Sequence, residues 1–121
     1  MKILSIGAHA LDAELMGGPY LTKRAQEGDQ VTFVHMTRGE RGNKNKSPLE
    51  YGKQLESEMV KVAQTMGGQA HWMGYVAGEL PSTMQLIEDF SNYIDQSGAE
   101  VVITHWRGSL HDRHILCHDV V

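Results

Sequence analysis

Four short apolar runs, separated by stretches with helical character, constrain the fold of this chain more than any other feature. The runs span Lys2 to Ala8, Val31 to Met36, Ala70 to Tyr75 and Glu100 to Thr104, and their aliphatic and β-branched residues are typical of buried strands. Strands that alternate with helices of this length are joined by crossovers, which make the strands parallel. We therefore expect an α/β protein, a Rossmann-like three-layer sandwich with a mainly parallel sheet.

Local signals indicate where the intervening helices begin. The sequence Ser47-Pro48-Leu49-Glu50 combines a capping serine, a proline at the first helical position and a glutamate three residues after the cap. Ser82 gives a similar signal before a third helix. The first helix is expected from about Asp12 to Glu27, and Pro19 should kink it or delay its start, because proline removes the hydrogen bond to the carbonyl of Leu15.

Length and composition exclude several classes of protein. The chain has 121 residues, a formal net charge of −4 and a single cysteine, Cys117. This length suits one domain, which we expect to span residues 1–121. The chain lacks the basic footprint of nucleic-acid-binding proteins, an apolar run of roughly 18 residues that could span a membrane, and a signal-peptide pattern. A lone cysteine forms no intrachain disulfide. These features predict a cytoplasmic protein without a nucleic-acid or membrane partner.

The side chains best suited to catalysis or ligand binding lie in the loops that follow two of the predicted strands. In parallel sheets, ligands bind beyond the carboxyl ends of the strands. The exit of the first strand carries His9 and Asp12 and lacks the G-x-G-x-x-G pattern of dinucleotide sites. The exit of the fourth strand carries His111 and His114, which share one face if a helix begins there. His105 opens the same exit and is a candidate to support a site rather than to form it.

The spacing of these residues favours a metal site. Each pair alone is more often a chance arrangement than a ligand pair, but both lie at strand exits that can be neighbours in the sheet. Two imidazole nitrogens and one carboxylate oxygen suit catalytic zinc, which keeps a further position open for water. We expect His9, Asp12 and His114 to surround one divalent metal, with Zn²⁺ the leading candidate.

Four segments, in order along the chain, carry a recognisable pattern. They are Ile6-Gly-Ala-His9 continuing into Asp12-Ala-Glu-Leu15, Gly17-Gly18, Thr37-Arg-Gly-Glu-Arg-Gly42 and Thr104-His-Trp-Arg-Gly-Ser-Leu-His-Asp-Arg-His114. Together they resemble the PIG-L/LmbE-like zinc-dependent N-deacetylases, over nearly the whole chain. The resemblance implies an LmbE-like fold and removal of acetyl groups from N-acetylglucosamine units in glycolipids, thiol-sugar precursors, antibiotics or chitin-derived oligosaccharides.

Matched residue by residue, the resemblance implies specific roles. It assigns His9, Asp12 and His114 to the metal and makes His111 the acid that stabilises the tetrahedral intermediate. The implied partner is a small amino-sugar or glycoconjugate substrate, and the implied activity is that of an amide hydrolase acting through a zinc-activated water.

Glu40 and Arg41 follow the second strand, where the family places groups that engage the sugar or organise the site. An exposed polar loop is an equally good interpretation of these two residues. Family members are roughly twice as long as this chain, so we expect an incomplete domain, the N-terminal half to two-thirds of an LmbE-like deacetylase. A homo-oligomer is also compatible with the sequence.

The first motif departs from the family pattern at the position of the general base. The family's His-Pro-Asp-Asp is here His9-Ala10-Leu11-Asp12, and leucine cannot accept a proton from water. Glu14 and Asp112 are the candidate replacements. Two hypotheses therefore remain: a zinc-dependent N-deacetylase with a different base, or a non-catalytic metal- or sugar-binding relative that has lost it.

Overall fold

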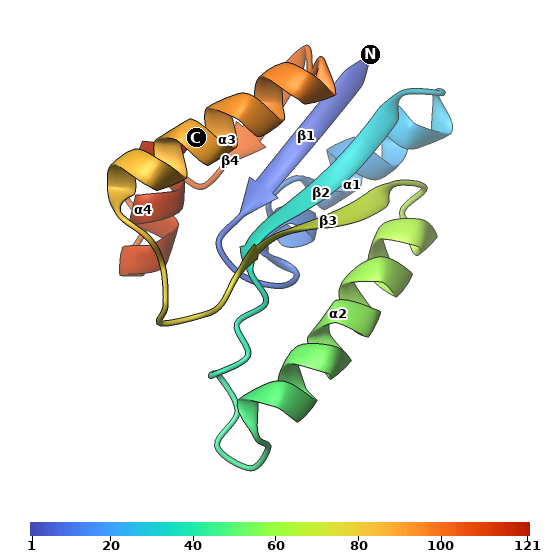
Figure 1. Ribbon diagram of the computed structural model, residues 1–121. Coiled ribbons are helices and arrows are strands. Elements are labelled where there is room, and N and C mark those ends of the chain that lie inside the picture. The colour runs from blue at the N-terminus through green and yellow to red at the C-terminus, as the bar shows by residue number, and fades with distance from the viewer.

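The computed structural model describes residues 1–121 as four strands and four helices that alternate along the chain (Figure 1). The elements are β1 (Lys2–Gly7), α1 (Asp12–Gln26), β2 (Gln30–Thr37), α2 (Pro48–Thr65), β3 (Gln69–Tyr75), α3 (Thr83–Ser97), β4 (Val101–Thr104) and α4 (Asp112–Val120). All strand pairs are parallel, and the order across the sheet is β3-β2-β1-β4. The predicted α/β class with a parallel sheet is confirmed.

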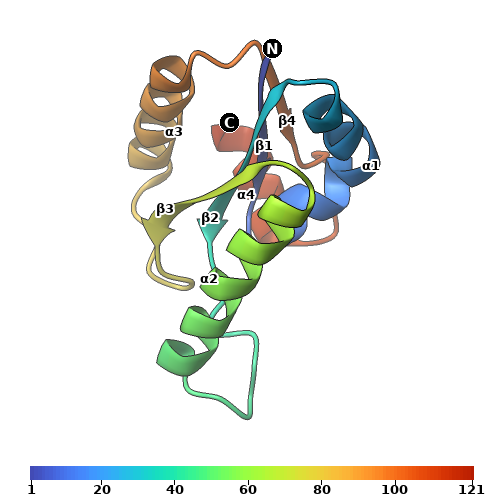
Figure 2. The same cartoon turned by 90° about the vertical axis from the view of Figure 1, so that its right-hand side faces the viewer.

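Helices cover both faces of the sheet, and Figure 2 shows α3 on one side of the strands and α1 on the other. Successive strand residues point to opposite faces. One core cluster joins Ile3 and Phe33 to α1 and α2, and a second joins Ile6 and Val34 to α3 and α4. The central strands are therefore buried on both sides, which explains why they are continuous apolar runs rather than alternating ones.

Helix α1 begins at Asp12 and continues through Pro19 to Gln26, so the expectation of a late start is wrong. The residue before it, Leu11, has a φ of 71°, in the left-handed region, and its side chain makes no capping hydrogen bond. A leucine in this conformation is strained because its Cβ crowds the following carbonyl oxygen. Contacts with the rest of the fold, rather than a local cap, must hold the start of α1.

The capping box predicted for α2 is present. The Ser47 hydroxyl accepts a hydrogen bond from the backbone N–H of Glu50, and the Glu50 carboxylate accepts one from the backbone N–H of Ser47. These bonds satisfy donors that the first turn would otherwise leave unpaired. No helix in the structure combines the length and apolar character needed to cross a membrane.

The sheet order brings the two predicted exits together. β1 lies between β2 and β4, with Ile6 paired to Val34 on one side and to Thr104 on the other. The loops that follow β1, β2 and β4 therefore leave from the same edge of the sheet. Residues distant in sequence meet at the carboxyl end of β1.

Candidate metal centre

His9, Asp12 and His114 converge at this edge of the sheet. His9 lies in the loop after β1, Asp12 is the first residue of α1, and His114 lies in the first turn of α4. One potential ligand atom from each lies within 4.8 Å of the other two. His9 Nδ1 is 3.1 Å and His114 Nε2 is 3.4 Å from the same oxygen, Oδ2 of Asp12.

These three side chains, the His9–Asp12–His114 group, fit a divalent metal. Ligands bound at about 2.0–2.1 Å to a tetrahedral ion lie roughly 3.3 Å from one another, close to the two separations at the Asp12 oxygen. Two imidazoles and a carboxylate are also the donor types that catalytic zinc takes. The group is partly exposed, with side-chain exposures of 26%, 19% and 24% in order along the chain, so solvent and small ligands can reach it.

The turn between β1 and α1 positions the first two members. The backbone N–H of His9 donates to Asp12 Oδ2 at 2.8 Å, which folds the loop back on the first residue of the helix. Gly7 permits a close approach: a Cβ there would lie 2.6 Å from the backbone nitrogen of Ala13. A side chain at residue 7 would push the start of α1 away from β1.

Burial and hydrogen bonding set the protonation states of the site. Burial acts to raise the pKa of Asp12, but hydrogen bonds from the side chain and backbone of His9 outweigh it and hold that pKa below its ordinary value. Burial lowers the pKa of His105 to about 4, and it also lowers the pKa of His114, although Asp12 opposes this second shift. At neutral pH, Asp12 is therefore ionised and the rings of His105 and His114 are neutral, the forms that bind or support a metal.

His105 is buried next to the centre and contacts two parts of it. Its side chain is only 6% exposed, and its Nε2 accepts a hydrogen bond from the backbone N–H of Ala8 at 3.0 Å. Its ring stacks on that of His114 with centroids 3.9 Å apart. His105 therefore fixes both the loop after β1 and the ring plane of His114.

His111 lies beside two members of the group. It is the N-cap residue of α4, and its Nδ1 accepts a hydrogen bond from the backbone N–H of Arg113. Its ring stacks on His114, with centroids 4.6 Å apart, and meets the ring of His9 edge-on at 5.0 Å. With Nδ1 occupied by the backbone, Nε2 is the ring nitrogen free to act on a ligand.

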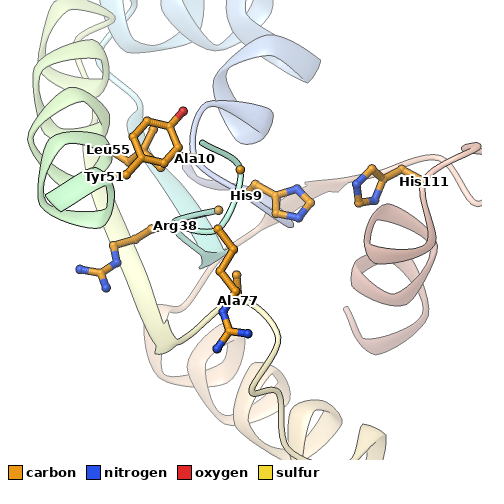
Figure 3. Close-up of a pocket in the computed structure, with 10 residues that line it drawn as sticks. His9, Ala10, Arg38, Tyr51, Leu55, Ala77 and His111 are labelled. Atoms are coloured by element: carbon orange, nitrogen blue, oxygen red, sulfur yellow. The ribbon is translucent and has the colours of Figure 1, made fainter. Parts of the chain in front are cut away.

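An open pocket of about 380 Å³ adjoins the centre. Figure 3 shows His9 and His111 reaching one side of it from two different loops, with Tyr51 and Leu55 of α2 opposite. The lining is completed by residues of the loops after β1, β2 and β3: Ala10, Arg38, Gly39, Arg41, Gly42 and Ala77. A ligand in this pocket would therefore touch the edge of the centre.

Arg41 lines this pocket, whereas Glu40 is buried and does not line it. Arg41 is half exposed and donates to Glu79 at 2.8 Å, which links the loops after β2 and β3. Glu40 is 1% exposed, and neither of its carboxylate oxygens has a hydrogen-bond partner. Its nearest charge is Arg38, at 3.6 Å. The exposed-loop interpretation therefore fails for Glu40, which is buried, but still fits Arg41, which is exposed and also lines the pocket.

Neither candidate replacement for the base belongs to the His9–Asp12–His114 group. Both carboxylate oxygens of Glu14 face Nε2 of His35, at 2.9 and 3.1 Å, under α1. Asp112 is exposed in the first turn of α4. Sequence reasoning missed the contact between Glu14 and His35, because nothing in their spacing pairs a helix residue with a strand residue.

The fold and the site together define an α/β protein with a His-Asp-His centre at the carboxyl edge of a parallel sheet. The sequence profile of the PIG-L family, described as GlcNAc-PI de-N-acetylase, matches residues 4–121. The chain belongs to this family, as the sequence motifs predicted.

Solved structures share the fold. N,N′-diacetylchitobiose deacetylase from Pyrococcus horikoshii superposes with a TM-score of 0.88 at 23% identity, over 98% of this chain and 47% of that one. Teicoplanin deacetylase Orf2, in a zinc-inhibited form, gives 0.86 at 14% identity, over 99% and 61%. The 4-carboxy-2-hydroxymuconate hydratase GalB from Pseudomonas putida gives 0.86 at 16%, over 98% and 53%. This chain thus spans about half the length of these proteins, and the fold alone does not separate deacetylases from a hydratase.

Proposed function

We propose that this protein is a metal-dependent hydrolase that removes an N-acetyl or other acyl group from an amino sugar or related amide. Family membership supports the reaction class. The observation that carries the proposal is the convergence of His9, Asp12 and His114 beside a pocket that also contains His111. A ligand set, a neighbouring acid and room for a substrate are what amide hydrolysis requires.

In this proposal, His9, Asp12 and His114 hold a divalent metal, with zinc favoured by the donor types. A metal bound there would lower the pKa of a water molecule towards neutrality and polarise the amide carbonyl. Water adds to the carbonyl carbon, the C–N bond breaks, acetate leaves, and the amine takes up a proton. His105 keeps the ring of His114 in place during these steps.

His111, beside His9 and His114, would act on the same carbonyl. Because its Nδ1 accepts a hydrogen bond from the backbone of α4, Nε2 carries the ring proton and would donate a hydrogen bond to the oxygen that gains negative charge. Arg41 lines the pocket and would contact the sugar. Glu40 would act indirectly: its carboxylate would hold Arg38 and, with it, the loop that carries Arg38 and Arg41.

Leu11 supports a second candidate, a relative that binds metal or sugar without catalysis. Leucine stands where the family's aspartate would accept a proton, and the carboxylate of Glu14 is engaged with His35. A positioned general base contributes roughly 10²- to 10⁴-fold in rate. Loss of that base would leave binding intact and hydrolysis weak.

A matched pair of variants at residue 11 distinguishes the two candidates. Leu11→Asp restores a proton acceptor, and Leu11→Asn has nearly the same shape without one. Both residues tolerate the left-handed conformation better than leucine does. The assay is acetate release from a panel of N-acetylated amino sugars with zinc present, for the wild type, both variants and His111→Ala.

If the protein is a hydrolase with another base, the wild type releases acetate and His111→Ala loses most of that rate. If it is a binding protein that lost its base, the wild type is inactive and Leu11→Asp alone gains activity, by about 100-fold or more over Leu11→Asn. Equal background rates from all four proteins on every substrate would reject the deacetylase proposal.

A further inference from the structure

Two buried polar side chains of the sheet lie under the first turn of α1. Ser5 of β1 and His35 of β2 are each 0% exposed. Farther from the site, the same face presents Ile3, Val31 and Phe33, which pack against α1 and α2. A buried polar group is destabilising unless it is hydrogen-bonded, so these two positions need a specific reason to be polar.

His35 is bonded at both ring nitrogens. Nδ1 lies 3.3 Å from the backbone carbonyl oxygen of His71, and a carbonyl can only accept, so Nδ1 carries a proton. Nε2 faces both oxygens of Glu14, which is itself only 4% exposed. The ring thus connects β3 through β2 to the first turn of α1.

Ser5 makes a second buried connection to the same turn. Its hydroxyl donates to the backbone carbonyl of Ala13 at 2.7 Å. Asp12 is therefore followed by two residues, Ala13 and Glu14, that are each tied to the sheet by a buried hydrogen bond. Gly7 completes this arrangement by letting the turn lie directly on β1.

Local support at the start of α1 comes from the turn before it, in which the backbone N–H of His9 donates to Asp12 Oδ2 and the backbone N–H of Asp12 donates to the His9 carbonyl. Leu11 gives it no side-chain cap and holds a left-handed backbone conformation. Such strain persists only where the surrounding structure fixes it. Relaxation of Leu11 would rotate the next residue, Asp12, whose Oδ2 is the oxygen shared by His9 and His114.

We propose that Glu14, His35 and Ser5 are positioning residues that hold Asp12 in its metal-binding orientation. The inference rests on the proposed metal centre and adds to it the part of the fold that keeps the centre assembled. It gives Glu14 a role different from that of a proton acceptor: Glu14 acts through the helix and does not touch the substrate.

The test measures metal binding directly. Zinc affinity is determined by competition with a chromophoric chelator for the wild type, Glu14→Ala, Glu14→Gln and Ser5→Ala. The visible absorption bands of the Co²⁺-loaded proteins report coordination geometry in parallel. Leu21→Ala is the matched control, because Leu21 is fully buried on the same helix but lies more than two turns beyond its first residue.

We expect Glu14→Ala to weaken zinc binding by about tenfold or more, as loss of a residue that orients metal ligands typically does. Ser5→Ala should weaken it less, and Glu14→Gln should recover part of the loss, because the amide offers Nε2 of His35 both a donor and an acceptor. Leu21→Ala should destabilise the fold yet keep the affinity and the Co²⁺ spectrum of the wild type.

The outcomes separate this inference from the proposed function. If the wild type takes up no metal, the proposed centre is wrong and the inference falls with it. If the wild type binds zinc and the Glu14 and Ser5 variants bind it equally well, only the positioning role is rejected. Should Glu14→Ala not fold, Glu14→Gln and Ser5→Ala still decide the matter, since each keeps the helix buried against the sheet.

Discussion

The strained conformation of Leu11 predicts that glycine at this position gives a more stable protein than alanine, the reverse of the usual order. Leu11→Ala and Leu11→Gly both remove the leucine side chain beyond Cβ, so their difference in stability isolates the effect of the Cβ on the backbone. At an ordinary position, glycine is less stable than alanine by about 0.4–1 kcal/mol, because it adds flexibility to the unfolded chain. At a φ of 71° a Cβ costs about 1–2 kcal/mol, a penalty that glycine does not have.

The strain exceeds the flexibility effect, so Leu11→Gly should be more stable than Leu11→Ala by about 0.5–1 kcal/mol. For a domain of this size, that difference corresponds to a melting temperature higher by roughly 2–5 °C. Urea unfolding of both metal-free variants, followed by circular dichroism, measures it. A glycine variant less stable than the alanine variant would mean that residue 11 is not held in the left-handed region, and the account of the first turn of α1 would be wrong.

Three further predictions concern the fold around the site. Glu14→Ala should lower the free energy of unfolding by about 3 kcal/mol, because it leaves buried His35 without its partner, and Glu14→Gln should lower it less; urea titrations compare the two. Gly7→Ala should cost about 1–3 kcal/mol, because the new methyl would lie 2.6 Å from the backbone of α1, and a cost below 0.5 kcal/mol would contradict this close approach. Burial lowers the pKa of His71, so the unfolded chain takes up a proton there more readily and stability falls as the pH drops below about 6.5. His71→Phe keeps the stacking on Tyr93 but should make this loss of stability shallower, and an unchanged pH profile would show that His71 does not contribute.

Most of the fold could be predicted from local patterns. The strands follow the apolar runs to within one or two residues, and the capping box at Ser47 is where the sequence indicated. The late start of α1 predicted from Pro19 is wrong, because tertiary packing of Ala13 and Leu21 holds the helix despite the missing hydrogen bond. The strand order, which sets β1 next to β4, is a property of the whole chain and has no local signal.

The candidate site was predictable only in part, because it too depends on contacts between residues distant in sequence. His9 and Asp12 are close in sequence, and the exit of β4 is marked by its own histidines, so their convergence follows once β1 and β4 are neighbours. His35, the partner of Glu14, is 21 residues away in a strand whose sequence is typical of an apolar core. A histidine in such a strand is more often a packing residue. Long-range contacts between single polar residues leave no periodic trace, which is why His35 could not be assigned a role from sequence.

The central claim is that His9, Asp12 and His114 hold one divalent metal. Equilibrium dialysis against zinc, followed by elemental analysis, tests it most directly on the wild type, on Asp12→Asn and on Asp95→Asn, the same change at an exposed position of α3. We predict one zinc ion per chain for the wild type and for Asp95→Asn, and none retained by Asp12→Asn after dialysis against a weak chelator. A wild type without zinc, or an Asp12→Asn variant that retains it, would contradict the account.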